Sequence, residues 1–410
     1  MPNATIVTRC CIAGGGPAGM MLGFLLARAG VDVLVLEKHA DFFRDFRGDT
    51  IHSSTLELML ELGLLEEFLK LPHQKVERLT AQIGDERVRM VDLTHLPTHC
   101  KYIALMPQWD FLNFLAEHGK RYPGFDLRMK AEATGLIEEG GRVVGLRAKT
   151  PEGELAIRAD LLVGADGRHS TVREKAGFKS DDYGAPMDVL WFRLPRKDTD
   201  ESETFGHFEA GAMMIMLNRG DYWQCAYVIP KGGMGRIEAD GLDAFRQRVL
   251  QMSPFLADRV GELKSFDDIK LLSVTVDRLR QWWRTGLICI GDAAHAMSPI
   301  GGVGINLAIQ DAVAAANRLA APLKAGQASD DDLRAIQERR TFPVRFTQAL
   351  QLTMQKRIIS RALAATQRPK PPLLFKIIGA LPILQRIPGR LLAVGVRPEH
   401  VHTPDMLAAS

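Results

Sequence analysis

A glycine-rich segment near the start of the chain could bind the phosphates of a dinucleotide. Gly14, Gly16 and Gly19 fit the pattern G-x-G-x-x-G, with Pro17 and Ala18 between the second and third glycines. In this pattern the first glycine permits a tight turn, the second lets the backbone approach a pyrophosphate, and the third lets the following helix lie close to the strand. The N-terminus of that helix would offer free N–H groups and a partial positive charge to the phosphates.

The residues on either side of this turn predict the strand, helix and strand that such a site requires. An apolar run at 9–13 precedes the turn, and an apolar helix is expected over 20–29. Residues 31–36 then read as a β-branched strand ending at Glu37, roughly 20 residues after the last glycine, the spacing expected for an acid that hydrogen-bonds an adenosine ribose. A G-x-G-x-x-G alone is often only a turn, but the complete unit predicts a dinucleotide site.

Two further acid-bearing turns follow strands later in the chain. Residues 155–163 read as a strand that stops at a turn containing Asp166, and residues 286–290 read as a strand that stops at a turn containing Asp292. A glycine turn at 301–304 then opens a strongly apolar, alanine-rich helix. A second helix N-terminus would therefore offer N–H groups to a negatively charged group.

The composition is that of an ordinary globular protein. With 410 residues, 46% of them hydrophobic and 25% charged, the chain can form a large core and two or three domains. A formal net charge of +3 is too small and too evenly spread to indicate nucleic-acid binding. The five cysteines include no C-x-x-C, and the eleven histidines do not group with acids, so we expect buried thiols and no metal site. The start of the chain lacks the pattern of a signal peptide, and we expect a cytoplasmic protein.

Several elements are expected between these motifs. A helix at 53–62 has a Ser/Thr N-cap, the runs 78–83 and 87–91 form a hairpin, and the segment 105–110 opens another helix that runs to about Gly119. From about 178 to 275 the pattern is mostly β. Strands in that part are expected at 189–194, 204–208, 213–217 and 222–230, followed by a helix at 242–252.

The mostly β segment concentrates aromatic and methionine side chains, which suit the lining of an apolar pocket. For any single one of them a place in the core is the simpler interpretation. Four polar residues are weak candidates for handling a ligand proton there, and each has a structural alternative: Arg193, His207, Tyr222 and Tyr227.

The last seventy residues are expected to be helical. Segment 371–392 is apolar, but proline and charge interrupt it and it is too short to span a bilayer. It could contact a membrane surface weakly beside its basic residues, pack on the body of the protein, or form a dimer contact. Monomer and homodimer both stay open.

With these motifs in one order, the chain resembles the class A flavoprotein monooxygenases, the p-hydroxybenzoate hydroxylase family. The motifs are Gly14 to Gly19, the stretch GADGRHSTVR at 164–173, and GDAAH at 291–295 followed by PIGGVGIN at 299–306. The first is generic, whereas the second and third together are specific. The resemblance covers residues 1 to about 320.

The resemblance implies an α/β fold, with an FAD-binding Rossmann-like domain of the glutathione-reductase type, an inserted β-sheet substrate domain and a helical C-terminal region. The implied boundaries are 1–74, 100–177 and 278–340 for the FAD-binding domain, 75–99 and 178–277 for the substrate domain, and 341–410 for the helical region.

FAD is the cofactor that the resemblance implies. Glu37 would bind the ribose, Asp292 the ribityl or pyrophosphate region, and backbone N–H groups at 302–306 the N1/O2 edge of the flavin, where a helix N-terminus supports the anionic reduced ring. Asp166 matches a motif associated with both FAD and NAD(P)H. The implied cofactor contacts are Gly14, Gly16, Pro17, Ala18, Gly19, Glu37, Lys38, Arg47, Gln108, Asp166, Gly167, Asp292, Pro299, Gly302, Val303, Gly304, Ile305 and Asn306.

The implied reaction is the hydroxylation of a small aromatic or other electron-rich organic substrate. NADH or NADPH reduces the flavin, O2 adds at C4a to give a hydroperoxide, and one oxygen atom passes to the substrate. Because only one G-x-G-x-x-G opens a helix, the nicotinamide would dock transiently. Two alternatives are a flavin-dependent reductase of a prenyl or other apolar substrate and a non-catalytic FAD-binding protein. Related halogenases carry W-x-W-x-I-P, which this chain does not match because Cys225 and Tyr227 stand at the tryptophan positions.

Overall fold

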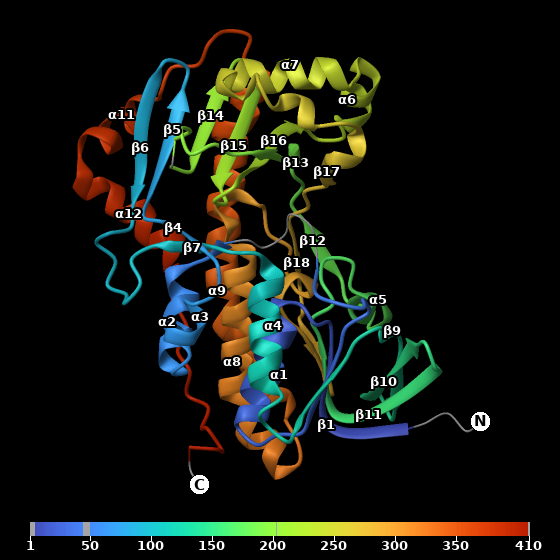
Figure 1. Ribbon diagram of the computed structural model, residues 1–410. Helices are drawn as coiled ribbons and strands as arrows, with labels where there is room; N and C mark the ends of the chain where they lie inside the picture. The colour runs from blue at the N-terminus through green and yellow to red at the C-terminus, as the bar shows by residue number, and fades with distance from the viewer. Residues whose placement is uncertain (1–4, 44–49, 202, 409–410) are drawn as a thin grey trace.

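The protein is built around an eight-stranded sheet with a second, seven-stranded sheet above it (Figure 1). The computed structural model describes residues 5–43, 50–201 and 203–408. The main path of the eight-stranded sheet is, in order, β19 (Trp283–Arg284), β20 (Leu287–Cys289), β11 (Gly153–Gly164), β1 (Thr5–Ala13), β2 (Val33–Leu36) and β8 (Phe125–Arg128). From β20 to β8 neighbouring strands are parallel.

Three helices cover one face of this sheet and two strands fold over the other. The helices are α1 (Pro17–Arg28), α4 (Gln108–Gly119) and α8 (Gly304–Ala325), and the strands are β9 (Glu132–Glu139) and β10 (Arg142–Thr150). Along β1, Cys10 and Ile12 belong to the core under the helices, whereas Cys11 and Ala13 belong to the core on the other face. Burial on both faces explains why β1 ends as a continuous apolar run. The predicted βαβ unit is confirmed.

The seven-stranded sheet joins segments that are far apart in the sequence. Its order is β17 (Lys270–Leu272), β13 (Met187–Pro195), β16 (Tyr222–Pro230), β15 (Ala212–Asn218), β14 (Phe205–Glu209), β5 (Arg78–Ile83) and β6 (Glu86–Asp92). The predicted hairpin is therefore present, and its strand β5 runs parallel to β14. Helices α6 (Met234–Asp240) and α7 (Leu242–Met252) cover one face of the sheet.

The other face of the seven-stranded sheet lies toward the α/β layer. Met187, Met213 and Val228 form a small core on this face with Ile359, and Ile300 packs against it. Ile300 belongs to the glycine turn before α8. The two layers thus meet where the sequence predicts a cofactor.

Short elements connect the layers. A three-stranded sheet has the order β3 (Thr50–Ile51), β7 (Ile103–Leu105) and β4 (Gln74–Val76), and β12 (Ser180–Asp182) pairs with β18 (Asp277–Leu279). The short helices are α2 (Ser53–Glu61), α3 (Leu65–Phe68) and α5 (Thr171–Lys175). The predicted Ser/Thr N-cap of α2 is wrong: His52 is the N-cap residue, and the Ser53 hydroxyl donates to the carbonyl oxygen of Tyr102 instead.

The C-terminal part is helical, as predicted. It comprises α9 (Asp330–Met354), a π-helical turn (Gln355–Ile359), α10 (Ser360–Ala364), α11 (Leu373–Ala380) and α12 (Pro382–Ala393). Helices α11 and α12 lie along the outer strand β6 (Figure 1). Among the described residues, no helix is both long enough and apolar enough to cross a bilayer.

Candidate cofactor-binding site

The site is organised by four strand ends that lie side by side. Cys289, Gly164, Ala13 and Leu36 are the last residues of β20, β11, β1 and β2, and they are paired in register across the sheet. Each is followed closely by one of the predicted motifs. Because ligands of open α/β sheets bind outside the carboxyl ends of the strands, this edge is where a cofactor is expected.

The glycines of the first motif serve two different purposes. A β-carbon on Gly14 would lie 2.3 Å from the carbonyl oxygen of Ala165, and one on Gly19 would lie 1.9 Å from that of Gly14. These two positions need glycine for packing within the protein, and Gly14 also has a φ of +110°. A β-carbon on Gly16, in contrast, would meet no atom of the protein within 4 Å.

The N-terminus of α1 behind Gly16 is open to an anion. No side chain of the described residues caps this helix, its first turn carries no acidic residue, and Pro17 is its first residue. Ala18 is buried, and its β-carbon lies beside Gly291 of the turn after β20. Uncapped N–H groups and open space beside Gly16 are the features that a pyrophosphate requires.

Glu37 is buried at the end of β2, and its carboxylate is turned toward the glycine turn. Its Oε2 accepts a hydrogen bond from the Gly15 N–H at 3.1 Å, and Oε1 accepts one from the His39 N–H at 3.0 Å. The acid is thus held beside the first motif, whereas the side chain of Lys38 is exposed.

The Asp166 side chain binds groups of the protein itself. Its carboxylate accepts hydrogen bonds from the Ser170 hydroxyl and from the Val172 N–H, and so holds the start of α5. Burial raises the pKa of Asp166, and these hydrogen bonds act in the opposite direction. Gly167 has a φ of +84°, and a β-carbon there would meet nothing.

Asp292 lies in the turn after β20 and is about one-third exposed. The Arg168 guanidinium, from the turn after β11, approaches its carboxylate to 3.8 Å. A β-carbon on the neighbouring Gly291 would lie 3.1 Å from that of Ala18 and 3.2 Å from that of Ala308. The turn that contains Asp292 therefore packs closely between the N-terminal parts of α1 and α8.

A buried charge network, which none of the sequence motifs indicated, supports this turn. Asp311 of α8 accepts hydrogen bonds from the Gly291 N–H at 3.0 Å, from His295 Nε2 at 2.5 Å and from Arg340 Nε at 2.8 Å. Arg340 also contacts Glu399 at 3.2 Å. Burial pushes the pKa of Asp311 upward, but His295 and Arg340 outweigh it and leave that pKa below its ordinary value. The feature of the sequence that could have indicated this network is Asp311, a charged residue inside an alanine-rich helix.

The second glycine turn, at 299–306, lies against β3. Gly302 has a φ of +63°, and a β-carbon there would lie 2.2 Å from Thr50 Oγ1, which donates to the Gly302 carbonyl oxygen. Gly304 has an ordinary φ, and its nearest neighbour would be the β-carbon of Met297 at 3.7 Å. As in α1, no side chain of the described residues caps α8 and its first turn carries no acid. Pro299 and Val303 flank the turn.

The side chain of Asn306 is occupied by the protein. Its Oδ1 accepts from the His52 N–H at 2.9 Å and from the Thr55 hydroxyl at 2.7 Å, while its Nδ2 donates to the carbonyl oxygens of Thr50 and Gly302. Asn306 thus ties α8 to β3 and to the start of α2. Only backbone groups of this turn remain for a cofactor, and the neighbouring Ile305 is buried.

Of the two remaining predicted cofactor residues, one lies in α4 and the other lies outside the described residues. Gln108 is the first residue of α4, beside β7, and is half-buried. The Trp109 ring next to it contacts Phe43 at a centroid distance of 4.8 Å. Arg47 lies outside the described residues.

The four candidates in the seven-stranded sheet divide between its two faces. Tyr227 packs on Phe245 of α7, so it belongs to the helix-covered core, and burial raises its pKa. His207 is paired with Met214 of the same core and lies 3.4 Å from Glu209.

Arg193 and Tyr222 alternate along their strands with residues of the helix-covered core, so they lie on the opposite face of the sheet. The Arg193 guanidinium stands over the Tyr222 ring at 5.0 Å. By strand alternation they share the face of Trp191 and Ala226, which looks toward the α/β layer.

Taken together, the fold and the site define an FAD-binding oxidoreductase with a sheet placed over the cofactor edge. Two uncapped helix N-termini, the open space at Gly16 and a buried acid at the second strand fit FAD. The family model described as "FAD binding domain" matches residues 7–349.

Proteins with similar sequences and folds are monooxygenases by name. The chain is 33% identical over 372 residues to 6-methylpretetramide 4-monooxygenase of Streptomyces rimosus, covering 90% of this chain and 88% of that protein. It is 31% identical over 323 residues to rifampicin monooxygenase of Streptomyces venezuelae, covering 76% and 63%. In fold it resembles p-nitrophenol 4-monooxygenase PnpA of Pseudomonas putida, with a TM-score of 0.74 at 21% identity over 93% of this chain and 96% of that one.

The chain belongs to this FAD-binding family and is a class A FAD-dependent monooxygenase that uses NAD(P)H. The resemblance inferred from the three motifs is therefore confirmed, and the reductase and non-catalytic alternatives are not supported.

Proposed function

We propose that this monooxygenase hydroxylates an aromatic compound held between the glycine turn at 299–306 and the inner face of the seven-stranded sheet. The observation that carries the proposal is the packing of Ile300 against the cluster of Met187, Met213, Val228 and Ile359, because it joins the turn expected at the flavin to an apolar sheet face. The names of the relatives 6-methylpretetramide 4-monooxygenase and p-nitrophenol 4-monooxygenase support a substrate of this kind.

The proposed roles of the cofactor residues follow from their positions. FAD, when bound, supplies electron transfer from NAD(P)H and the activation of O2. The N–H groups at the start of α1 would bind its pyrophosphate, Glu37 its ribose, and Asp292 the ribityl or pyrophosphate region. The uncapped N-terminus of α8 would stabilise negative charge on the reduced ring.

Substrate positioning would fall to the inner face of the sheet. Trp191 carries a buried Nε1 that has no hydrogen-bond partner among the described residues, and Arg193 and Tyr222 share its face. Because a buried donor without a partner is costly, we propose that Trp191 donates to a substrate oxygen. His207 and Tyr227, on the opposite face, would support the sheet.

The reductant would dock beside Arg168. Its guanidinium lies between Asp292 and the carbonyl oxygen of Ser273, at the junction of the two layers. NADH and NADPH are both candidates for the reductant.

We also propose the domain division given above, which the pairing of β5 with β14 supports. For the oligomeric state we propose a monomer or a homodimer.

Anaerobic stopped-flow reduction tests this function. With FAD-loaded enzyme and NADPH or NADH, reduction should be at least about tenfold faster in the presence of a phenol or a polycyclic aromatic substrate, which is roughly 1.4 kcal/mol of the barrier. The aerobic reaction should then yield a product heavier by one oxygen atom. Reduction that no aromatic compound accelerates, together with no oxygenated product, would refute the proposal.

A further inference from the structure

Helices α11 and α12 expose an apolar surface that the monooxygenase reaction does not use. We define the apolar patch as the six large apolar side chains of these helices and their junction that are 41–74% exposed: Leu373, Leu374, Ile377, Leu381, Ile383 and Ile387. No residue of α11 is buried, although five of its eight side chains are Leu, Ile or Phe.

Small and polar residues, not the large apolar ones, attach these helices to the sheet. A β-carbon on Gly379 would lie 2.8 Å from Val88, and one on Gly389 would lie 2.6 Å from the carbonyl oxygen of Asp92. Buried Gln385 donates to the carbonyl oxygens of Ile378 and Gly379 and so joins the two helices. The patch therefore faces away from the sheet, because the close contacts of Gly379 and Gly389 with β6 hold the opposite side of each helix against it.

The charge around the patch is positive. Residues 339–398 contain twelve Lys and Arg residues and no Asp or Glu. Lys370, Arg386 and Arg390 stand in or next to these helices and have no ion pair among the described residues.

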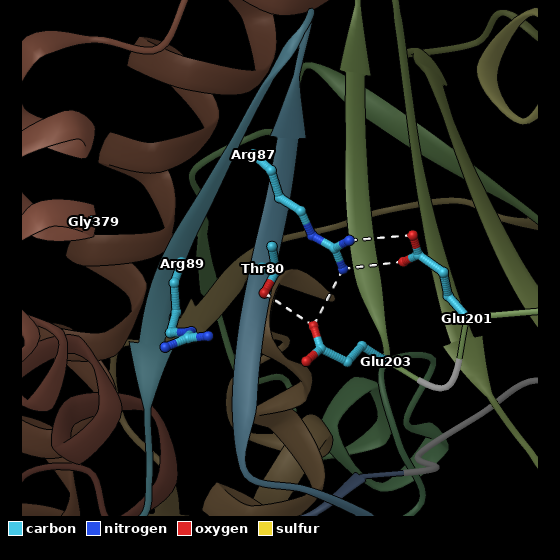
Figure 2. Close-up of a pocket in the computed structure, with 6 residues that line it drawn as sticks. All are labelled: Thr80, Arg87, Arg89, Glu201, Glu203 and Gly379. Atoms are coloured by element: carbon cyan, nitrogen blue, oxygen red, sulfur yellow. Dashed lines mark hydrogen bonds and ion pairs between the residues drawn. The ribbon is translucent and has the colours of Figure 1, made fainter.

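The acids of the neighbouring hairpin and the strand beside it are already paired. Lys376 binds Glu86, and Arg368 binds Asp85 and Glu209. The open groove beside Gly379 has the same distribution of charge. Arg87 binds Glu201 and Glu203, whereas Arg89 on the same strand has no ion pair within the described part of the chain (Figure 2). The charges left unpaired around the patch are therefore cations.

We propose that the apolar patch docks on an anionic phospholipid surface. Exposed Leu and Ile side chains would enter the acyl boundary, and the unpaired Lys and Arg side chains would contact the headgroup phosphates, as in amphipathic helices that lie in a membrane interface. A second copy of the chain suits the patch less well, because a symmetric contact would bring like charges together.

Flotation of the FAD-loaded full chain with vesicles tests this. The protein should bind vesicles that contain phosphatidylglycerol, bind pure phosphatidylcholine vesicles weakly, and detach at high salt. The double variant Leu373→Glu/Ile383→Glu should bind at least about tenfold more weakly. Its matched control is Val7→Glu/Leu271→Glu, which replaces side chains that are 79% and 47% exposed in other parts of the molecule and should bind like the unmodified protein.

A charge pair of variants tests the electrostatic part. Lys370→Gln/Arg386→Gln should lose most of the preference for anionic vesicles, whereas the control Lys149→Gln/Arg236→Gln should keep it. Retained FAD absorbance shows that each variant is folded. Absence of vesicle binding, equal binding to both lipids, or a change from dimer to monomer in the Leu373→Glu/Ile383→Glu variant would each overturn the proposal, the last in favour of a second copy.

Discussion

The ring of His52 is joined to the C-terminal helices through Leu392, with 2.9 Å between Nδ1 and the Leu392 carbonyl oxygen. His52 also stands at the N-cap position of α2, where its side chain makes no capping hydrogen bond, and its Nε2 is buried without a hydrogen-bond partner among the described residues. Burial lowers the pKa of His52 to about 4, although the Leu392 and Gly301 carbonyls act in the opposite direction. One imidazole therefore depends on both the glycine turn and the C-terminal region.

This pKa predicts a loss of stability in mild acid. The unfolded chain takes up a proton near pH 6.5, whereas the folded ring resists it until about pH 4, so the stability present above pH 6.5 falls as the pH drops through this interval. The loss should reach up to about 3 kcal/mol. Urea unfolding measured across this range checks it. His52→Gln should flatten the slope, and the exposed control His402→Gln should not; a slope that survives in His52→Gln would contradict the assignment.

Replacing Asp292 should weaken FAD binding without unfolding the protein. Asp292→Ala removes one charge-assisted hydrogen bond, which costs roughly 1.5–3 kcal/mol, or about ten- to a hundredfold in affinity. Flavin absorbance after extensive dialysis is the measurement, with the exposed Asp198→Ala as control. Full retention of flavin by Asp292→Ala would place this acid outside the cofactor site.

A side chain at Gly304 should damage turnover and leave folding intact. Within the protein a β-carbon there meets only Met297 at 3.7 Å, so Gly304→Val should unfold near the normal temperature. If α8 faces the flavin, the new side chain would displace the N–H groups from the ring and lower the reduction potential. Gly235→Val, on another helix with open space around it, is the matched control. An unchanged potential and turnover in Gly304→Val would separate this turn from the flavin.

Breaking the buried charge network should destabilise the whole α/β layer. Asp311→Asn removes the carboxylate that binds both Arg340 and His295 and leaves buried Arg340 with Glu399 alone among the described residues. Removal of one partner from a buried pair costs about 3–5 kcal/mol. Because the pKa of Asp311 is held below its ordinary value, its contribution is present at neutral pH and is lost only below about pH 4. Thermal unfolding at pH 7 should show a large drop for Asp311→Asn and almost none for the exposed Asp331→Asn. Equal unfolding temperatures would refute the network's role.

Local patterns predicted the elements that hold the site. Apolar runs, glycine spacing and the acid at Glu37 identified the βαβ unit because each depends on neighbours in sequence. The hairpin at 78–92 was predicted for the same reason. Its partner strand was not, since the pairing of β5 with β14 depends on contacts between distant segments.

Side-chain partners from distant segments limited the prediction of the site. Asn306 was expected at the flavin edge through its backbone, and nothing in the motif indicated that its amide would bind the His52 N–H and the Thr55 hydroxyl. A Ser or Thr was expected at the N-cap position of helix α2, but His52 stands there, and Asn306 binds its N–H. The link from Asp311 through Arg340 to Glu399 spans three separate segments and has no local pattern.

The pairing of β5 with β14 also sets an order of events during synthesis. Residues 84–204 must leave the ribosome before β14 can join β5, which at about 5–20 residues per second is a delay on the order of ten seconds. Throughout that time the hairpin has an open strand edge that other chains could join. Arg78 on β5, with Arg87 and Arg89 on the neighbouring β6, gives the hairpin a positive charge that discourages such pairing, so these arginines would protect the nascent chain from aggregation before any cofactor arrives.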